Sequence, residues 1–382
     1  MELIVFSEVK WNYLRTRKRF ILSNFPGDTR VIFFEPIRFS RRNDFLPKTH
    51  GNVTYVCTPV LKPSTESRLY NWLTRFGAVR AVLDLVIVVW VRLLMLALRP
   101  RSDSPVLVSN VYFAPVVESM KSRFVCYDCN DDPTFFPGVP PWAVQYFNRL
   151  CRRADAVVAC SASLARRLED SCGKRVTVIG NGVDYELFSR AVEPREIPSD
   201  IAALPEPVVG YTGAVKEWFD FELLARSAKE NPRASFAVVG PVSPSVAREA
   251  ARLSGSLRNV HFLGEKPYAS LPLYLAPMQV CLIPFVMSPL TAVLNPNKLY
   301  EYFAAGKTVV SLKYSCDLAA FGSLMYLAER AEGFPGAVSR ALEAPLDAGR
   351  LKEAASGHTW RKKADELYAI LISRGHSKET AR

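Results

Sequence analysis

Hydrophobic positions fall into short buried runs that alternate with amphipathic stretches along the first half of the chain. The amphipathic stretches include Trp142–Arg153 and Ser163–Ser171, which have a helical period. The predicted strands of this half are Leu3–Phe6, Val31–Glu35, Val53–Thr58, Val106–Ser109, Phe124–Asp128, Ala156–Ser161 and Val176–Ile179. Buried strands that alternate with helices are typical of a parallel, doubly wound sheet.

The same alternation starts again after a proline-rich interruption. Residues 189–207 contain four prolines and no clear period, which favours a linker. The predicted strands after it are Val208–Thr212, Ser235–Val239, Val260–Phe262, Val280–Pro284 and Thr308–Leu312. A chain of 382 residues also suits two domains of about 150–200 residues each. We therefore expect two α/β domains, residues 1–190 and 208–359, joined by a linker at residues 191–207.

One long apolar stretch, Ala78–Leu98, fits neither pattern. Its charged residues, Arg80, Asp84 and Arg92, fall on one side of a helix and leave about 240° apolar. Its longest run without a charge, Leu85–Val91, is much shorter than the roughly 20 residues that span a bilayer. The helix is expected either to be buried in the first domain or to lie in a membrane interface.

Charge and cysteine usage narrow the class of protein. The net charge is +12, and residues 1–100 hold sixteen Lys and Arg against seven Asp and Glu. Such a basic region attracts anionic lipid, an anionic substrate or nucleic acid alike, but no nucleic-acid motif is present, so nucleic acid is not expected. Eight cysteines without regular spacing argue against a disulfide framework and for a reducing compartment. Because the first residues read as a strand and lack a signal peptide, a cytoplasmic location is expected.

The segment Asn295–Lys307 is the strongest chemical signal. Asn295 is expected to cap a helix, Pro296 to occupy its first position and Gly306 to end it. Free N–H groups and Lys298 in the first turn make a site for phosphate, and Glu301 lies one turn further on. A capped core helix without a ligand is the alternative for this segment taken alone.

This segment resembles the donor-site helix of GT-B glycosyltransferases of family 4. Further stretches resemble that family's motifs in the same order, and the likeness is strongest to bacterial enzymes that build polysaccharides such as teichuronic acid. These stretches are Tyr127–Asp132, Val178–Phe188, Val209–Lys216 with Trp218–Glu222, and Asn259–Gly264. The resemblance implies two Rossmann-like, doubly wound domains that face a central cleft. The last helical stretch, Trp360–Ser373, lies within residues 360–382, which the resemblance implies pack back on the first domain.

The resemblance also implies roles for particular residues. The donor-binding residues implied are Asn181, Gly182, Gly213, Lys216, Phe262, Asn295, Asn297, Lys298, Leu299 and Glu301. Asp128 and Asp131 are implied as catalytic carboxylates for the acceptor hydroxyl, whereas Asp132, before a proline, is expected to be a turn residue. Acceptor binding is assigned to Trp11, Arg15 and Arg17, with an ordinary amphipathic helix as the alternative.

Two positions depart from the family pattern. Ala214 stands where relatives carry an arginine, and Val293 stands where they carry the first of two glutamates. The implied activity is transfer of a sugar from a nucleotide diphosphate sugar to a polysaccharide or lipid-linked acceptor, with retention and without a metal or other cofactor. The basic first domain adds an anionic membrane surface as a partner, at the inner face of the membrane. The alternatives are a nucleotide-sugar 2-epimerase of the same fold and a non-catalytic relative that binds the nucleotide sugar.

Overall fold

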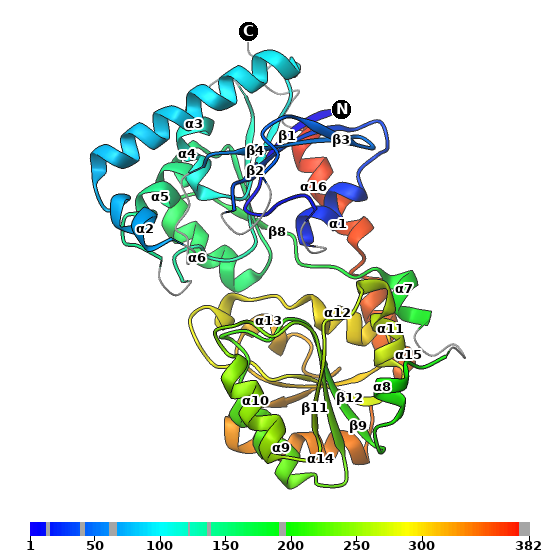
Figure 1. Cartoon of the computed structure of the whole chain (residues 1–382). Helices are drawn as coiled ribbons and strands as arrows, with labels where there is room; N and C mark the ends of the chain where they lie inside the picture. Colours follow the sequence, from blue (N-terminus) through cyan, green and yellow to red (C-terminus); the bar gives the residue numbers. More distant parts are fainter. Residues whose placement is uncertain are drawn as a thin grey trace. The chain divides into compact units, whose positions relative to one another are not determined.

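The computed structural model describes residues 1–12, 16–38, 43–60, 67–120, 123–135, 139–190 and 196–373. Arg15 lies outside these residues. The chain divides into two compact units: unit 1 is Met1–Ile179 together with Lys363–Arg382, and unit 2 is Gly180–Lys362. Each unit contains one sheet flanked by helices (Figure 1).

The sheet of unit 1 has the strand order β3-β4-β2-β1-β5-β6-β7-β8. Its strands are β1 Glu2–Phe6, β2 Arg30–Pro36, β3 Lys48–His50, β4 Val53–Thr58, β5 Val106–Val108, β6 Val125–Cys129, β7 Ala156–Ala159 and β8 Val176–Val178. Neighbouring strands pair in parallel, except that β3 and β4 are antiparallel. The central strands β1 and β6 are buried along their whole length, as expected for a parallel sheet covered on both faces.

Within the described residues, seven stretches of helix belong to unit 1 before its last helix. They are α1 Arg17–Ser23, α2 Arg68–Leu73, α3 Gly77–Leu98, the 3₁₀ turn η1 Val111–Phe113, α4 Ala114–Glu118, α5 Ala143–Arg153 and α6 Ala162–Cys172. The long helix predicted at Ala78–Leu98 is therefore present as α3, one residue longer at its start.

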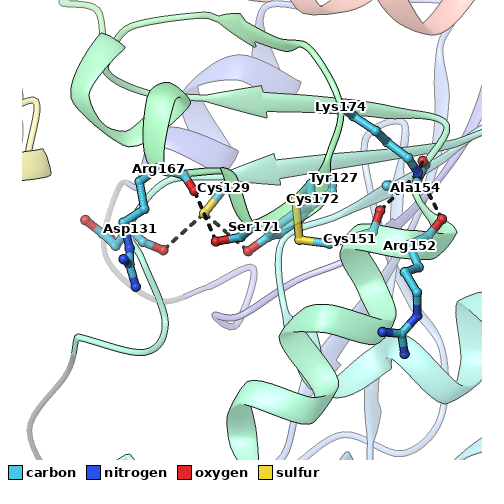
Figure 2. Close-up of a disulfide and its surroundings, with 10 residues drawn as sticks. All are labelled: Tyr127, Cys129, Asp131, Cys151, Arg152, Ala154, Arg167, Ser171, Cys172 and Lys174. Carbon is cyan, nitrogen blue, oxygen red and sulfur yellow. Dashed lines mark hydrogen bonds between the residues drawn. A yellow bond between two sulfur atoms is a disulfide. The ribbon is translucent and has the colours of Figure 1, made fainter. Parts of the chain in front are cut away.

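A disulfide joins Cys151 of α5 to Cys172 of α6 (Figure 2). The irregular cysteine spacing gave no indication of this pair. Beside it, the ammonium of Lys174 donates to the backbone carbonyls of Cys151, Arg152 and Ala154 at the end of α5, at 3.0, 2.9 and 2.6 Å. A cation at this position satisfies carbonyls that the helix leaves without partners. The pair and Lys174 together fix the C-terminal end of α5 against α6.

Helix α3 exposes its apolar side, so the expectation that it is buried in the first domain was wrong. Figure 1 shows it (cyan) along the outside of unit 1. It is long and apolar enough to cross a membrane, and only 11% of its most apolar 18-residue stretch is buried. Ile87 and Val91 are its only fully buried residues among those described. The side chains of Val82, Leu85, Val86, Val89, Leu93 and Leu96 are between 45% and 73% exposed. We call these six residues the α3 outer face.

The sheet of unit 2 has the order β11-β10-β9-β12-β13-β14, and its neighbouring strands pair in parallel. Its strands are β9 Val208–Thr212, β10 Ser235–Val239, β11 Val260–Gly264, β12 Met278–Ile283, β13 Thr308–Leu312 and β14 Tyr326–Ala328. Strands β9, β10 and β13 begin and end at the predicted residues. The short strands β3 and β14, each at a sheet edge, were not predicted.

Helices cover this second sheet and pack on its core. They are α7 Tyr185–Ser189, α8 Ser199–Ala202, α9 Phe221–Glu230, α10 Ala247–Ser256, α11 Leu271–Leu275, α12 Asn297–Ala304, α13 Cys316–Ala319, α14 Phe334–Glu343 and α15 Ala348–Ser356. Short 3₁₀ turns are η3 Tyr268–Ser270, η4 Thr291–Val293 and η5 Ala331–Gly333. Helix α8 falls within the expected linker, and its Ile201 is buried in the unit 2 core.

The last helix, α16, covers Trp360–Ser373, the range predicted from the sequence. Its residues from Lys363 onward belong to unit 1. There Leu367 and Leu371 are buried, and the ring of Tyr368 makes an edge contact with Phe25, with ring centroids 5.2 Å apart.

Candidate active site

The predicted donor helix α12 starts one residue later than expected. Pro296 occupies the N-cap position with extended backbone, and Asn297 is the first helical residue. Asn295 does not cap the helix, because both ends of its side-chain amide have other partners. The amide nitrogen donates to the Tyr300 hydroxyl at 3.1 Å, and the side-chain oxygen Oδ1 accepts from the Asn181 backbone N–H at 3.3 Å. Gly306, with φ +67°, ends α12 as predicted. The amides of the first turn are thus free of side-chain caps, which suits an anionic ligand.

Lys298 points to the place where the sheet of unit 2 reverses its winding. From β9 the chain proceeds to β10 and β11 on one side, and β12, β13 and β14 lie on the other. The Lys298 ammonium lies 5.1 Å from the ring centroid of Tyr211 on β9 and 4.8 Å from that of Phe285, which follows β12. Ligands of open α/β sheets bind at the carboxyl ends of strands at such a switch point. Lys298 therefore stands at the expected ligand position.

Two glycines let the loops after β9 and β10 close on Lys298. Gly213 has φ +133°, and a Cβ added there would lie 3.2 Å from Cε of Lys298. Gly240 has φ +149°, and a Cβ there would lie 2.0 Å from the carbonyl oxygen of Gly213, so only glycine fits. The Tyr302 hydroxyl accepts a 2.8 Å hydrogen bond from the Thr212 backbone and fixes α12 to the end of β9. Backbone and cation are thereby held close together.

Glu301 lies one turn after Lys298 and is buried, with 8% of its surface exposed. The Tyr268 hydroxyl donates to its Oε1 at 3.1 Å. Burial raises the pKa of Glu301, and Lys298 and Tyr268 oppose that rise. Burial lowers the pKa of Lys298, and Glu301 opposes that fall. Both groups are therefore easier to neutralise than in water, and a charged ligand can shift their protonation.

The loop Asn181–Gly182 lies beside α12 within unit 2. The Asn181 side chain donates to the Asn295 backbone carbonyl. A Cβ on Gly182 would lie 2.9 Å from the Trp360 backbone nitrogen, so this glycine permits close packing of the loop on residues 358–360. The hydrogen bonds place Asn181 directly beside Asn295.

The other predicted donor residues have separate surroundings. The ammonium of Lys216 lies 5.2 Å from the Trp218 ring centroid. Phe262 lies on β11 and packs against the unit 2 core. Leu299 is buried in that core and therefore anchors α12 through its side chain. Val293, at the position of the family's first glutamate, is also buried, with 7% exposed.

In unit 1 the structure places Asp128 differently from the expectation of a catalytic carboxylate. Asp128 is fully buried, 2.7 Å from the Lys18 ammonium and 3.6 Å from the Arg17 guanidinium. Burial raises the pKa of the Asp128 carboxyl group, but the opposing effect of Lys18 and Arg17 is larger. The pKa of Asp128 is therefore below its ordinary value. A buried, ion-paired carboxylate is enclosed by its own unit and cannot reach an acceptor hydroxyl in this arrangement.

The predicted acceptor residues Trp11 and Arg17 are also internal. Trp11 is 6% exposed, its backbone donates to Glu35 at 2.8 Å, and its ring meets Phe33 edge-on. Arg17 is 5% exposed and donates to the Ile179 carbonyl at 2.7 Å. Sequence alone could not reveal these partners, because Asp128 and Ile179 are far from residue 17 in the chain.

Asp131 and Asp132, although neighbours, have different environments. Asp132 is fully buried; it pairs with Arg167 and accepts from the Thr134 backbone at 2.8 Å, which is the expected turn role. Asp131 is half-buried, and its backbone carbonyl accepts from the Cys129 thiol at 3.3 Å (Figure 2). Of the two predicted carboxylates, Asp131 is the one whose side chain is partly open to solvent.

A polar cluster that the sequence motifs missed lies at the switch point of unit 1, between β1 and β5. Glu8 follows β1, Ser109 follows β5 and Asn130 follows β6. The Glu8 carboxylate accepts from the Ser109 hydroxyl and, at 3.0 Å, from the Asn130 side chain. The sequence did contain a signal for this cluster, since a polar residue follows soon after each of these buried strands. Among the described residues, no group of three or more His, Cys, Asp or Glu is arranged to hold a metal ion.

Comparison with known proteins agrees with this division into units. A Glycosyltransferase Family 4 model matches residues 112–187, and a Glycosyl transferases group 1 model matches residues 206–344. Over 165 residues the chain is 30% identical to TuaH of Bacillus subtilis (strain 168), a glycosyltransferase assigned to teichuronic acid biosynthesis. That match spans 42% of this chain and 41% of the relative.

Two solved structures resemble nearly the whole chain. An E. coli trehalose-6-phosphate structure bound with UDP-2-fluoro glucose has a TM-score of 0.74 and 12% identity, covering 97% of this chain and 99% of that one. Anabaena Alr3699/HepE in complex with UDP has a TM-score of 0.66 and 16% identity, covering 97% and 100%. At these identities the likeness shows the fold. That fold is the GT-B fold, and both family models that match the chain describe glycosyltransferases.

Proposed function

We propose that the protein transfers a sugar from a nucleoside diphosphate sugar to a hydroxyl group of a saccharide acceptor. The observation that carries this proposal is the position of Lys298, next to the uncapped start of α12 and at the switch point of unit 2. Two structures of similar fold hold UDP-2-fluoro glucose and UDP, which supports a nucleotide donor.

The donor diphosphate would bind against the amides near Asn297 and the Lys298 ammonium. When the bond from the anomeric carbon to the phosphate oxygen breaks, its electron pair stays on the leaving diphosphate. Lys298 and the α12 amides would offset that charge. Glu301, held by Tyr268, is assigned to the ribose hydroxyls. Lys216 and Phe262 remain assigned to the phosphate and base ends of the donor.

For the acceptor we assign the cluster of Glu8, Ser109 and Asn130, together with Asp131. These polar side chains follow the strands at the switch point of unit 1. A carboxylate there can hold the acceptor hydroxyl by accepting its hydrogen bond. Asp128 is reassigned to the stability of unit 1, because its charge is used internally.

The stereochemical course proposed is retention. The acceptor oxygen bonds to the anomeric carbon on the face that the diphosphate leaves, and its proton passes to the leaving phosphate oxygen. We also propose that no metal is needed, since Lys298 and the helix amides supply positive charge. Activity that persists in a chelator, and a product of unchanged anomeric configuration by proton NMR, are the expected results.

The acceptor is proposed to be a growing polysaccharide or a lipid-linked saccharide at the cytoplasmic face of a membrane. The resemblance to a protein of teichuronic acid biosynthesis supports a cell-envelope polysaccharide. The basic excess of residues 1–100 supports an anionic surface nearby.

A thermal-shift panel of nucleoside diphosphates and their sugars tests the donor class. A ligand at 100 times its dissociation constant should stabilise the fold by about 2.7 kcal/mol. With the donor known, transfer is assayed with and without a saccharide acceptor. Product that forms only with acceptor supports transfer. A sugar nucleotide that is altered in the absence of acceptor would contradict transfer and favour the epimerase.

A further inference from the structure

We propose that α3, with the end of α2, is a membrane-docking surface that lies in the plane of an anionic lipid bilayer. The proposal deepens the proposed function by naming the partner that brings a lipid-linked acceptor to the enzyme. It does not need the sugar-transfer chemistry to be correct, because membrane binding is measured without a nucleotide sugar.

Helix α3 has the reverse of the polarity that a surface helix normally shows. A helix on a water-exposed surface turns its charges outward and its apolar side inward. On α3 the outer face is the apolar one: Leu85, Leu93 and Leu96 are 63%, 57% and 73% exposed. Water contact with such a continuous apolar strip is unfavourable, and large exposed apolar patches mark interaction sites.

Two of the three charged groups of α3, those of Arg80 and Asp84, are turned toward the protein instead. The Asp84 carboxylate accepts from the Tyr146 hydroxyl at 3.0 Å and from Arg149 at 3.2 Å. Arg80 donates to the Thr74 carbonyl at 2.9 Å, and its guanidinium lies 5.3 Å from the Trp142 ring centroid. These contacts hold the inner side of α3 on unit 1 and leave the outer face for an apolar partner.

The same contacts argue for a helix that lies on the bilayer rather than across it. Spanning would require α3 to leave Tyr146 and Arg149 and carry Asp84 into hydrocarbon, which costs several kcal/mol. It would also expose the groups against which Ile87 and Val91 are buried. Lying in the interface keeps these contacts and immerses only the outer face.

Aromatic side chains lie at the start of this surface. Trp72 of α2 and Phe76, which precedes α3, are 52% and 50% exposed, and their rings meet edge-on with centroids 5.3 Å apart. Trp is enriched at the boundary between lipid headgroups and hydrocarbon, where an amphipathic ring is stable. The aromatic pair therefore fits the depth at which a docked α2 would lie.

Charge selects an anionic bilayer over a second copy of the chain. Arg68, Arg75, Arg92 and Arg99 are exposed along this surface, and Asp84, the one acidic residue in the described range 67–100, points inward. A symmetric dimer through the same face would bring these arginines near their own copies, which is unfavourable. Anionic headgroups would instead attract each arginine.

Co-sedimentation with vesicles tests the docking surface. The full chain is mixed with vesicles of phosphatidylcholine alone and with vesicles that also contain phosphatidylglycerol. We expect binding that is strongest to the anionic vesicles and weaker in high salt, where the Debye length falls from about 10 Å at 0.1 M to about 3 Å at 1 M. Absence of binding to either vesicle would overturn the proposal.

Matched variants locate the contact. The triple variant Leu85→Asn, Val89→Asn, Leu93→Asn should bind vesicles at least about tenfold more weakly, because each change removes apolar area from the interface. It should unfold at the same or a higher temperature, since all three side chains are exposed. The control variant Val178→Asn, Ile197→Asn alters exposed apolar residues elsewhere and should bind like the wild type. Equal binding by the triple variant would contradict the assignment.

Two further readouts separate the competing occupants. Arg75→Gln with Arg99→Gln should weaken binding to anionic vesicles and leave binding to neutral vesicles unchanged. Size-exclusion chromatography that shows a dimer lost in the triple variant, with no vesicle binding, would overturn the lipid assignment. Resistance of the bound chain to alkaline carbonate extraction would indicate a spanning helix and would also overturn it. Unchanged thermal shifts with nucleotide in the triple variant would show that the donor site is intact, so the two proposals can fail separately.

Discussion

The Tyr268 hydroxyl donates a hydrogen bond of 3.1 Å to the carboxylate of Glu301. Tyr268 belongs to the turn η3 after β11, whereas Glu301 belongs to α12, so this bond links two separate parts of unit 2. It orients one carboxylate oxygen and favours its ionised form, since the bond lowers the pKa of Glu301. The second oxygen is left to accept from a ligand.

Glu301→Ala should abolish measurable donor turnover while the protein stays folded. Hydrogen bonds to a charged group contribute about 1.5–3 kcal/mol, so donor affinity should fall about 10- to 100-fold. Calorimetric titration with the nucleoside diphosphate checks the loss. Tyr268→Phe is the matched control: it keeps the carboxylate, raises its pKa and should cause a smaller loss at neutral pH. Full activity in the alanine variant would remove Glu301 from the donor site.

Lys298→Met should stabilise the protein and remove diphosphate binding. The partly buried ammonium is desolvated, so its charge costs folding free energy that a methionine side chain would not. We expect a gain of about 1 kcal/mol, or roughly 2–4 °C in melting temperature. In the folded protein the pKa of Lys298 is lowered from 10.5 to about 8. The loss of wild-type stability caused by its charge is therefore complete below pH 8 and disappears as the pH rises to 10.5. A variant that is less stable and still binds diphosphate would contradict this role.

Donor affinity should depend on pH with two limbs. Burial raises the pKa of Glu301 to about 7, so its ionised form is lost as pH falls below 7. Burial lowers the pKa of Lys298 to about 8, so its charge is lost as pH rises above 8. Nucleoside diphosphate affinity should thus peak between these values and fall up to about tenfold per pH unit on the alkaline side.

Inorganic diphosphate is the matched probe for this pH dependence. It has no ribose, so Glu301 should not matter and only the alkaline limb should remain. The Lys298→Met variant should show no alkaline limb with any ligand that still binds. A flat profile with nucleoside diphosphate from pH 6 to pH 9 would contradict the assignment of both groups.

Asp128→Asn should destabilise unit 1 rather than act on catalysis alone. The change leaves the buried Lys18 ammonium without its 2.7 Å partner. Breaking a buried ion pair from one side costs about 3–5 kcal/mol, or roughly 10 °C in melting temperature. Differential scanning calorimetry measures the loss. Asp131→Asn, at a half-buried side chain, should leave the melting temperature unchanged and lower turnover with acceptor. The opposite pattern would restore Asp128 as the catalytic carboxylate.

Prediction from the sequence succeeded where a signal is local. Strands β9, β10 and β13 are runs of buried residues between turn signals, and α16 has a clear helical period, so their ends were predicted correctly. The start of α12 was predicted one residue early, because Asn295 is a good N-cap by type but bonds to Tyr300 instead. Local propensity could not anticipate that competing partner.

Prediction failed where a side chain's partner comes from a distant segment. Lys298 was identified from its own helix, but its aromatic neighbours Tyr211 and Phe285 follow from the order of strands in the sheet. The burial and ion pairing of Asp128 were not anticipated for the same reason, since its partner Lys18 lies on α1. The hydrophobic pattern of α3 allowed two placements, and only the packing of unit 1 decides which side faces outward.

The membership of α16 has a consequence for how the chain is made. Unit 1 begins at Met1, yet Leu367 and Leu371, which fill part of its core, are translated after the whole of unit 2. Domains usually fold in the order of their synthesis. Here the first 179 residues of unit 1 are synthesised before the helix that completes its core. Unit 2 is one continuous segment, so all its residues are synthesised before unit 1 is complete. Helix α16, which is translated after unit 2, thus completes the unit whose strands are translated before unit 2.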